Sequence, residues 1–300
     1  MKVVGQSLVK LLKRTTEQWI ELLDKKLKEF EPNCVVEKSY WNVDIKEKNT
    51  LVVCIGESWT WGDGGLTDRP NQMYGRLLSN HYNADWINIG GRGYSNTWIL
   101  DFANFVAFEL KQSNYQKIIF VVTMTENGRD CSTRAHHNYD YFKYDRVTEE
   151  TFDLILSDFE DIYIDKLTTL LENIDDRYKL VVGNGFSWNQ KTVDWLTSKN
   201  IIQPNLTWVE LLADKQNIPR PARTNLVYNF TFSMHFARLL ETNPKYNTIE
   251  YKSWVIPKMD LAEKTHEFLQ RSKLNFDIHP NAEGHKFWAQ EIINLVENNQ

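Results

Sequence analysis

The chain has 300 residues, 42% of them hydrophobic, and a formal net charge of −5. This length and apolar content are enough for one elaborated domain with a substantial buried core. The acidic balance, with a pI near 5.9, gives no overall electrostatic surface for a nucleic-acid backbone, so only a local basic patch would bind such a partner.

The first 49 residues have the pattern of a basic amphipathic helix, with apolar side chains at helical spacing between lysines. Such a helix can lie on a membrane surface or a partner, but it more often packs on its own domain. We therefore expect residues 1–49 to form an N-terminal helical extension of a main domain, residues 50–300. The apolar positions are Leu8, Leu11, Leu12, Trp19, Leu22, Leu23, Leu27 and Phe30, and the lysines are Lys10, Lys13, Lys25 and Lys26.

From residue 50 onward, strand-like and helix-like stretches alternate along the chain. This alternation favours an α/β fold, a three-layer sandwich whose central parallel sheet is covered by helices on both faces. In such sheets, functional sites form beyond the carboxyl ends of the strands. Strands are expected at 51–55, 85–89, 117–124 and 178–183, and helices near 71–82, 95–112 and 149–174 and at the C-terminus.

Two stretches look like insertions into this alternating core. Residues 130–148 are polar and rich in aromatic side chains, and a loop there would roof a site at the end of the preceding strand. Residues 219–257 are too many for a simple connection, so we expect a helical subdomain or an oligomer contact there.

A serine directly follows the first expected strand. Residues 56–62 read Gly-Glu-Ser-Trp-Thr-Trp-Gly, and Ser58 stands where the apolar run breaks into a loop. A hydroxyl at such a break can be presented above the sheet edge, where a nucleophile is needed. The alternative is that Ser58 only caps an ordinary strand-to-helix turn.

Two later strands also end in residues that suit either a turn or a site. Residues 86–95 finish the second strand and contain Gly93, while residues 125–129 follow the third strand and contain Asn127. Gly93 suits a tight turn with a positive φ angle, and Asn127, which precedes a glycine, suits a plain turn.

Residues 276–285, Phe-Asp-Ile-His-Pro-Asn-Ala-Glu-Gly-His, lead into an amphipathic C-terminal helix. A proline follows His279 and pushes it toward extended geometry. Residues two apart in an extended stretch point to the same side, so Asp277 can approach His279. The alternative is that Asp277 caps a turn and that His279 is a solvated residue ahead of a helix.

In this order, the four stretches resemble the four sequence blocks of the SGNH (GDSL-type) hydrolases. The resemblance implies a flavodoxin-like SGNH hydrolase fold and a serine esterase that hydrolyses a carboxylic ester. It implies Ser58 as the nucleophile, His279 as the general base and Asp277 as the residue that orients the imidazole. It also implies an oxyanion hole made of the backbone N–H groups of Ser58 and Gly93 and the side-chain amide of Asn127.

The sequence departs from the family pattern at three places. Glu57 stands where the family has Asp, Thr125 and Gly128 replace the Gly and Asp of the third block, and Asp277 precedes His279 by two residues instead of three. These departures leave open a catalytically weak or inactive module that binds carbohydrate or has a structural role. An acyltransferase that uses the same site to pass the acyl group to an acceptor other than water is a further alternative.

Aromatic residues gather around the first two blocks. Trp59, Trp61 and Tyr94, together with Arg129, are candidate substrate-binding residues. Exposed rings beside a polar pocket suit stacking on sugar rings, whereas a lipase would use a long aliphatic groove. We therefore expect the ester to be an O-acetyl or similar small acyl group on a carbohydrate. The alternative is that these rings belong mostly to the core.

The sequence predicts neither a metal nor a cofactor. The His136–His137 pair and the His279/His285 pair lack helical i, i+4 spacing with a carboxylate partner, so we expect solvated or capping roles for them. The glycine-rich stretches at 62–65 and 90–93 lack the downstream residues of a phosphate-binding loop. The oligomeric state stays open.

Cysteine usage and the N-terminus bear on the compartment. Cys34, Cys54 and Cys131 are widely spaced and form neither a disulfide framework nor a Cys-x-x-Cys pair. Residues 1–7 lack the apolar core of a secretion signal, and no uncharged apolar stretch is long enough to span a bilayer. We expect a soluble, cytoplasmic protein.

Overall fold

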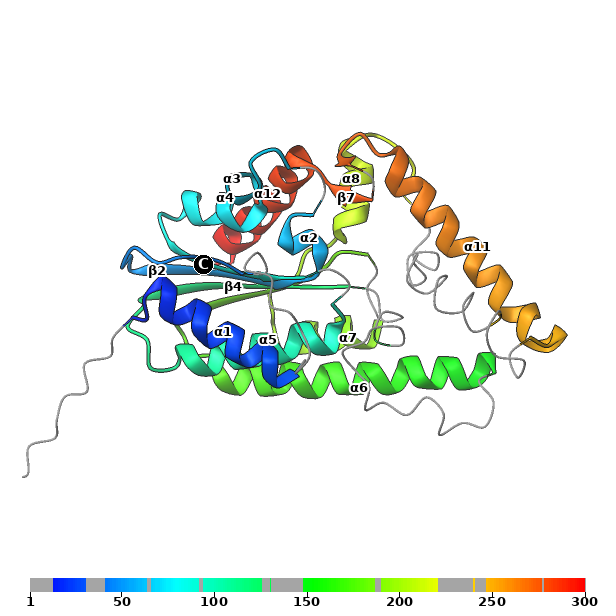
Figure 1. Ribbon diagram of the computed structural model, residues 1–300, viewed down its shortest axis with the longest axis horizontal. Helices are drawn as coiled ribbons and strands as arrows, with labels where there is room; N and C mark the ends of the chain where they lie inside the picture. Colours follow the sequence, from blue (N-terminus) through cyan, green and yellow to red (C-terminus); the bar gives the residue numbers. More distant parts are fainter. Residues whose placement is uncertain are drawn as a thin grey trace, which may run out of the picture.

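A five-stranded sheet forms the middle of the computed structural model, with the strand order β1-β3-β2-β4-β5 (Figure 1). The strands are β1 (Trp41–Asp44), β2 (Thr50–Gly56), β3 (Asp85–Gly90), β4 (Lys117–Met124) and β5 (Tyr178–Asn184). The structure describes residues 13–30, 41–63, 66–91, 94–125, 130, 148–186, 190–220, 240, 247–276 and 278–299.

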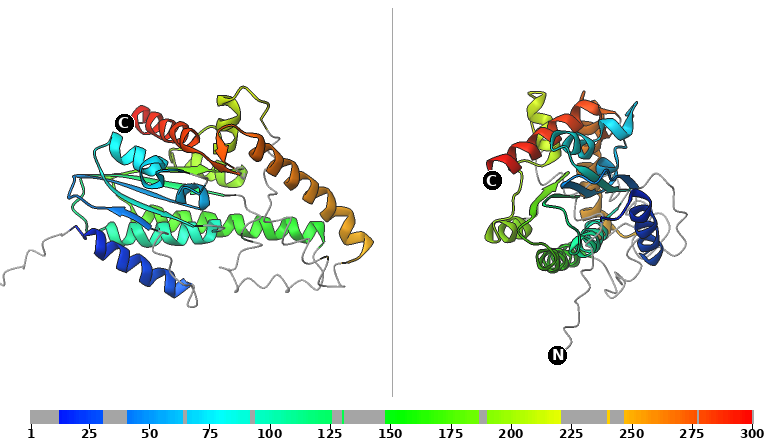
Figure 2. Two further views of the ribbon diagram at one scale, coloured as in Figure 1. Left: turned by 45° about the horizontal axis from the view of Figure 1, so that its top comes forward. Right: turned by 90° about the vertical axis from the view of Figure 1, so that its left-hand side faces the viewer.

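Helices cover both faces of this sheet. In Figures 1 and 2, α1, α5, α6 and α7 lie on one face, and α2, α3, α4, α8 and α12 lie on the other. The first group is α1 (Thr16–Phe30), α5 (Asn96–Leu110), α6 (Glu149–Asn173) and α7 (Gln190–Ser198). The second is α2 (Ser58–Trp61), α3 (Arg69–Gln72), α4 (Tyr74–His81), α8 (Trp208–Lys215) and α12 (Ala282–Asn298). The described residues also form α11 (Ile249–Arg271) and a small hairpin of β6 (Asn275–Phe276) and β7 (His279–Pro280).

Four strands of the sheet, β3, β2, β4 and β5, run parallel to one another, whereas β1 is antiparallel to β3. The predicted three-layer α/β fold with a parallel sheet is therefore confirmed. The chain goes from β2 outward to β3 and then crosses back to β4 on the other side of β2. The strand order thus reverses beside β2, and a crevice for a ligand is expected at the carboxyl ends of strands where the order reverses.

The central strands are buried on both faces because each face carries a helical layer. In β2, Val53 and Ile55 belong to the core shared with α1, α5 and α6. Val52 and Cys54 point to the opposite core, which includes side chains of α4, α8 and α12. This double burial explains why β2 and β4 read in the sequence as continuous apolar runs rather than as alternating patterns.

The two described elements before position 50 belong to the main fold, since α1 packs against the sheet and β1 is one of its strands. The expected helix is present as α1, and its buried Trp19, Leu23 and Leu27 pack into the same core as β2. The edge strand β1 was not predicted, because four residues with a polar Asn and Asp give no strand signal. The indole of Trp41 in β1 donates a 2.7 Å hydrogen bond to Asp24 in α1, which ties these two elements together.

Helix α11 begins within the expected insertion at 219–257 but continues well beyond it. Pro257, the last residue of the expected insertion, lies inside the helix instead of at its end. The α11 side chain of Lys258 forms a 2.8 Å ion pair with Glu149 at the start of α6. None of the helices in the described residues is both long and apolar enough to cross a membrane.

Candidate active site

Ser58 is placed by a sharp turn from β2 into the short helix α2. Gly56 ends the strand where a Cβ atom would lie 2.1 Å from Thr60 Oγ1, so a larger residue would clash there. Glu57 caps α2, and Gly62 ends it with a φ angle of 78°, which favours glycine. Ser58 is therefore the first residue of α2, directly beyond the carboxyl end of the central strand.

His279 reaches the same place from the far end of the sequence. It lies in β7, which pairs with β6 in a tight antiparallel hairpin just before α12. Its Nε2 atom is 3.1 Å from Ser58 Oγ, although the two residues are 221 positions apart. The structure thus brings together a hydroxyl and an imidazole at hydrogen-bonding distance, as a nucleophile and its base require.

Two carboxylates that flank the short helix α2, those of Glu57 and Asp63, also lie at this pair. Glu57 Oε2 accepts a hydrogen bond from Ser58 Oγ, and Glu57 Oε1 accepts one of 3.0 Å from the backbone N–H of Trp59. Asp63 Oδ2 is 3.9 Å from His279 Nε2. In the sequence, Glu57 is visible only as a departure from the family pattern. Nothing in the sequence indicates a role for Asp63, because its position near the imidazole depends on the turn of α2.

A chain of buried hydroxyl groups within hydrogen-bonding distance of one another stabilises the α2 turn. Tyr74 OH lies 3.2 Å from Thr60 Oγ1 and 3.1 Å from Thr123 Oγ1, which connects α2, α4 and β4. Asn88 in β3 donates a 3.0 Å hydrogen bond through Nδ2 to the carbonyl oxygen of Thr60. These contacts hold α2, and with it Ser58, against three neighbouring elements. Sequence reasoning missed Tyr74 because its role depends on tertiary contacts.

His285 is fully buried behind the site and is not solvated, contrary to the expectation from the sequence. Its Nδ1 atom accepts a 3.3 Å hydrogen bond from the backbone N–H of Tyr74, and its ring lies edge-on to Trp208. Burial, with a smaller contribution from His279, lowers the pKa of His285 to about 3. A neutral imidazole with this burial is a packing and hydrogen-bonding group, not a base for the reaction.

The remaining predicted catalytic and oxyanion residues, Asp277, Gly93 and Asn127, lie outside the described residues, as does Arg129. On either side of Asn127, the nearest described residues are Thr125 and Asp130. Thr125 exchanges two hydrogen bonds with the side chain of Asn96, one of 2.7 Å and one of 2.9 Å.

Asp130, on the other side of the same segment, is also anchored at the start of α5. Its carboxylate accepts hydrogen bonds from the backbone N–H groups of Asn96 at 3.1 Å and Thr97 at 3.2 Å. It also accepts a hydrogen bond from the hydroxyl of Tyr163. Thr125 and Asp130 are thus both held at the start of α5, a constraint that spacing in the sequence does not reveal.

Three aromatic residues predicted to bind substrate are buried in the protein. Trp59, Trp61 and Tyr94 are 1%, 6% and 8% exposed. Trp59 packs edge-on against Trp208 at a 5.2 Å centroid distance, and Tyr94 stacks on Trp98 at 3.6 Å. The expectation that these rings are exposed is wrong, because neighbouring side chains cover them. Trp61 is covered by the guanidinium of Arg69, 4.4 Å from its ring centroid.

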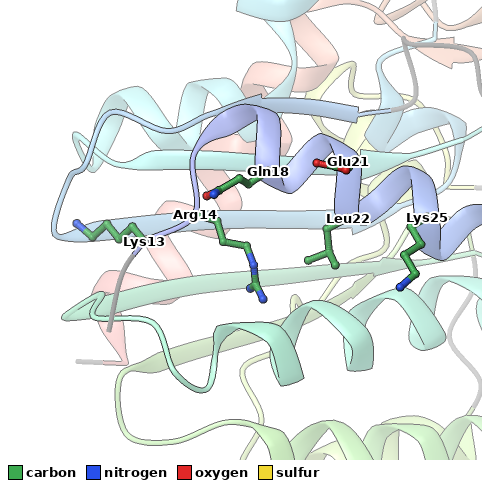
Figure 3. A pocket seen from close by; sticks show the side chains of 6 residues that line it. All are labelled: Lys13, Arg14, Gln18, Glu21, Leu22 and Lys25. Carbon is green, nitrogen blue, oxygen red and sulfur yellow. The ribbon is translucent and has the colours of Figure 1, made fainter. Parts of the chain in front are cut away.

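A groove of about 440 Å³ lies beside α1 and is lined by Lys13, Arg14, Gln18, Glu21, Leu22 and Lys25 (Figure 3). Arg14 extends toward α5 and forms an ion pair with Glu109 there. The groove contains neither Ser58 nor His279, and mixed charges line it. In the described part of the chain, no three His, Cys, Asp or Glu side chains converge as ligands for a metal ion.

Comparison with known proteins gives matches at the level of structure alone. No protein-family model matches the chain, and no curated protein matches it. The chain is similar to solved structures of G-D-S-L lipolytic proteins and carbohydrate esterases.

Three of these structures illustrate the similarity. A member of the lipolytic protein G-D-S-L family from Veillonella parvula has a TM-score of 0.39 and 9% identity, with 82% of this chain and 97% of that chain covered. A catalytic mutant of an acetylxylan esterase from Geobacillus stearothermophilus has a TM-score of 0.39 and 10% identity, with 84% and 96% covered. An alpha/beta hydrolase enzyme from the metagenome of Lake Arreo has a TM-score of 0.40 and 12% identity, with 83% and 94% covered. Because these scores and identities are low, we transfer no residue role from these structures to this chain.

Proposed function

We propose that the chain is a serine esterase of the SGNH (GDSL) type, with Ser58 as the nucleophile and His279 as the general base. The observation that supports this most directly is the 3.1 Å distance between Ser58 Oγ and His279 Nε2. Ser58 lies two residues beyond the carboxyl end of the central strand β2, at the end of the sheet where α/β enzymes place their sites. The order of the four motifs along the sequence supports the same assignment.

The proposed reaction has two halves. His279 Nε2 takes the hydroxyl proton while Ser58 Oγ attacks the ester carbonyl carbon, and the negative charge passes to the carbonyl oxygen. We assign the backbone N–H groups of Ser58 and Gly93 and the side chain of Asn127 to that oxyanion. The alcohol then leaves with the proton from His279. Water cleaves the acyl-enzyme with His279 as the base again, and Asp277 is the residue proposed to orient the ring.

The proposed substrate is a carboxylic ester with a small acyl group, and an O-acetyl group on a carbohydrate is the first substrate to test. Because Trp59 and Trp61 are buried, stacking of a sugar ring on these two side chains no longer supports this choice. A series of p-nitrophenyl esters with acyl chains of two to eight carbons, set beside acetylated sugars, tests it directly. A maximum of kcat/KM at acetate would support the small-acyl assignment, and a maximum at the long chains would contradict it.

Substitution of the nucleophile tests the esterase assignment itself. We expect the Ser58→Ala variant to lose at least about 10³-fold of the p-nitrophenyl acetate turnover and all covalent labelling by a fluorophosphonate probe. Ser253→Ala, which changes an exposed serine on α11, is the matched control and should keep both.

The outcome of that pair of measurements also separates the alternatives. A wild-type protein with neither turnover nor Ser58-dependent labelling would be a binding or structural module, and the esterase assignment would fall. A labelled protein that hydrolyses poorly but acylates an added sugar or alcohol would be an acyltransferase, which analysis of the products by mass spectrometry identifies.

A further inference from the structure

Ser58 Oγ has a second polar neighbour besides the imidazole. Glu57 Oε2 accepts a hydrogen bond from this hydroxyl, while His279 Nε2 lies 3.1 Å from the same oxygen. A serine hydroxyl carries one proton. At any instant the proton is therefore directed either to the carboxylate or to the imidazole, and both groups are positioned to receive it.

The carboxylate of Glu57 is held in a defined position. Its Oε1 atom accepts the 3.0 Å hydrogen bond from the backbone N–H of Trp59 as the cap of α2, which leaves Oε2 directed at Ser58. The residue is 1% exposed. Hydrogen bonds to carboxylates are stronger than those between neutral groups, and exclusion of water strengthens them further. Glu57 therefore does more at this site than cap a four-residue helix.

We propose that Glu57 is a second proton acceptor for Ser58 and thus a catalytic residue, an inference that rests on the proposed esterase function. In this route the Oγ–carbon bond forms, the electron pair of the carbonyl π bond moves to the carbonyl oxygen, and the hydroxyl proton passes to Glu57 Oε2. When the tetrahedral intermediate collapses, the carbonyl re-forms and the ester C–O bond breaks. The leaving oxygen takes the proton, and Glu57 returns to the carboxylate.

Asp63 is a second carboxylate close to this pair, with Oδ2 3.9 Å from His279 Nε2. Glu57 differs from Asp63 in that its carboxylate accepts a hydrogen bond from the Ser58 hydroxyl itself. Of these two carboxylates, Glu57 is therefore the one positioned to take the proton of Ser58.

Removal of the imidazole isolates the contribution of Glu57. The reactivity of Ser58 is measured as the second-order rate of labelling by a fluorophosphonate probe. We expect His279→Ala to slow labelling by about 10²–10⁴-fold, the usual contribution of a general base, and to leave a measurable rate. Adding Glu57→Gln should lower that residual rate by a further factor of about ten or more. The amide can still accept the Trp59 N–H hydrogen bond through its oxygen, but it cannot take a proton from Ser58.

Two comparisons separate proton transfer from damage to the structure. Glu210 is another buried glutamate that caps a helix, α8, through a capping box with Thr207, so Glu210→Gln in the His279→Ala background should leave the labelling rate unchanged. The His279→Ala/Glu57→Asp variant keeps a carboxylate that is one methylene shorter. We expect its rate to lie between the rates of His279→Ala and the Glu57→Gln double variant. Thermal melting of every variant shows which of them fold.

Equal labelling rates for His279→Ala and His279→Ala/Glu57→Gln would overturn the inference, as would a His279→Ala rate no higher than that of Ser58→Ala. If the Glu57→Gln double variant fails to fold, the His279→Ala/Glu57→Asp variant decides. A labelling rate of this variant equal to or above that of His279→Ala also overturns the inference. A labelled wild-type protein with any of these results leaves the esterase assignment intact. An unlabelled wild-type protein overturns both proposals.

Discussion

The two histidines of the C-terminal segment occupy opposite environments although the sequence presents them in one motif. His279 is partly buried at the site and lies beside Ser58 Oγ, whereas His285 is enclosed by Tyr74 and Trp208. The difference comes from α12, whose first turn directs His285 toward the core while β7 holds His279 at the sheet edge. The same side-chain chemistry thus gives a candidate base and a structural group.

His285 makes the protein sensitive to acid. Its folded-state pKa of about 3 lies below the usual value near 6.5, so the unfolded chain binds a proton first as the pH falls. The contribution of His285 to stability is therefore complete above about pH 6.5 and is lost progressively toward pH 3. The variant His285→Asn retains an acceptor near Tyr74 N–H. Between pH 6.5 and pH 4.5, we expect the unfolding free energy of the wild type to fall by about 2 kcal/mol more than that of this variant. Urea denaturation at these two pH values measures both changes, and equal changes for variant and wild type would contradict the prediction.

Gly56 is required because α2 approaches it closely. A Cβ atom at this position would lie 2.1 Å from Thr60 Oγ1 and 2.9 Å from the carbonyl oxygen of Thr123. We expect Gly56→Ala to cost about 1–3 kcal/mol of stability and to lower kcat, because relief of the clash moves the turn that holds Ser58. Gly185→Ala is the control, since a Cβ there would lie at an ordinary contact distance of 3.6 Å from the carbonyl oxygen of Met124. Denaturation and steady-state kinetics of both variants test this, and an equal effect of the two would refute it.

At the scale of elements, the hydroxyl of Tyr74 joins α4 to α2 and β4. Tyr74→Phe would leave the buried hydroxyls of Thr60 and Thr123 without this partner. We expect a loss of about 1–3 kcal/mol in the free energy of unfolding and a lower kcat with little change in KM. Tyr82→Phe serves as the control, because in the described part of the chain the Tyr82 hydroxyl is buried with no hydrogen-bond partner. A Tyr82→Phe variant as damaged as Tyr74→Phe would speak against a role of this connection.

Elements with a strong local signal could be predicted from the sequence, and those that depend on a neighbour could not. The strand at 51–55 is apolar over its whole length and the strand at 117–124 over most of it, because helices cover both faces of the sheet. By contrast, β1 is a strand only because β3 offers it a free edge. Helix α11 continues through Pro257, where a local rule places a boundary.

At the scale of the whole molecule, the candidate site depends on bringing together Ser58, just beyond β2, and His279 in the β6–β7 hairpin. The sequence could indicate Ser58 and His279 because a strand end, a proline and the order of the motifs are visible in it. It could not indicate that Glu57 contacts Ser58, because that depends on the direction of α2, or that Trp59 is covered, because Trp208 comes from a distant segment.

The C-terminal helix sets the position of that hairpin. Asn281 caps α12 through hydrogen bonds from the N–H groups of Glu283 and Gly284, immediately after β7. Trp288 of α12 stacks on Trp208 of α8 at a centroid distance of 5.1 Å, deep in the core. The imidazole of His279 is therefore attached to a packed helix rather than to an isolated loop, which favours a fixed geometry at the site.

The short strand β1 shields the outer border of β3. Its four residues pair with Trp86 to Ile89, a stretch that is buried along its whole length. An exposed edge strand of this kind can pair with strands of other polypeptides, and such pairing leads to aggregation. A truncated protein that starts at residue 50 would keep Ser58 and His279 but would expose β3 as an edge strand. Residues 41–44 therefore protect against aggregation, a role separate from the proposed chemistry.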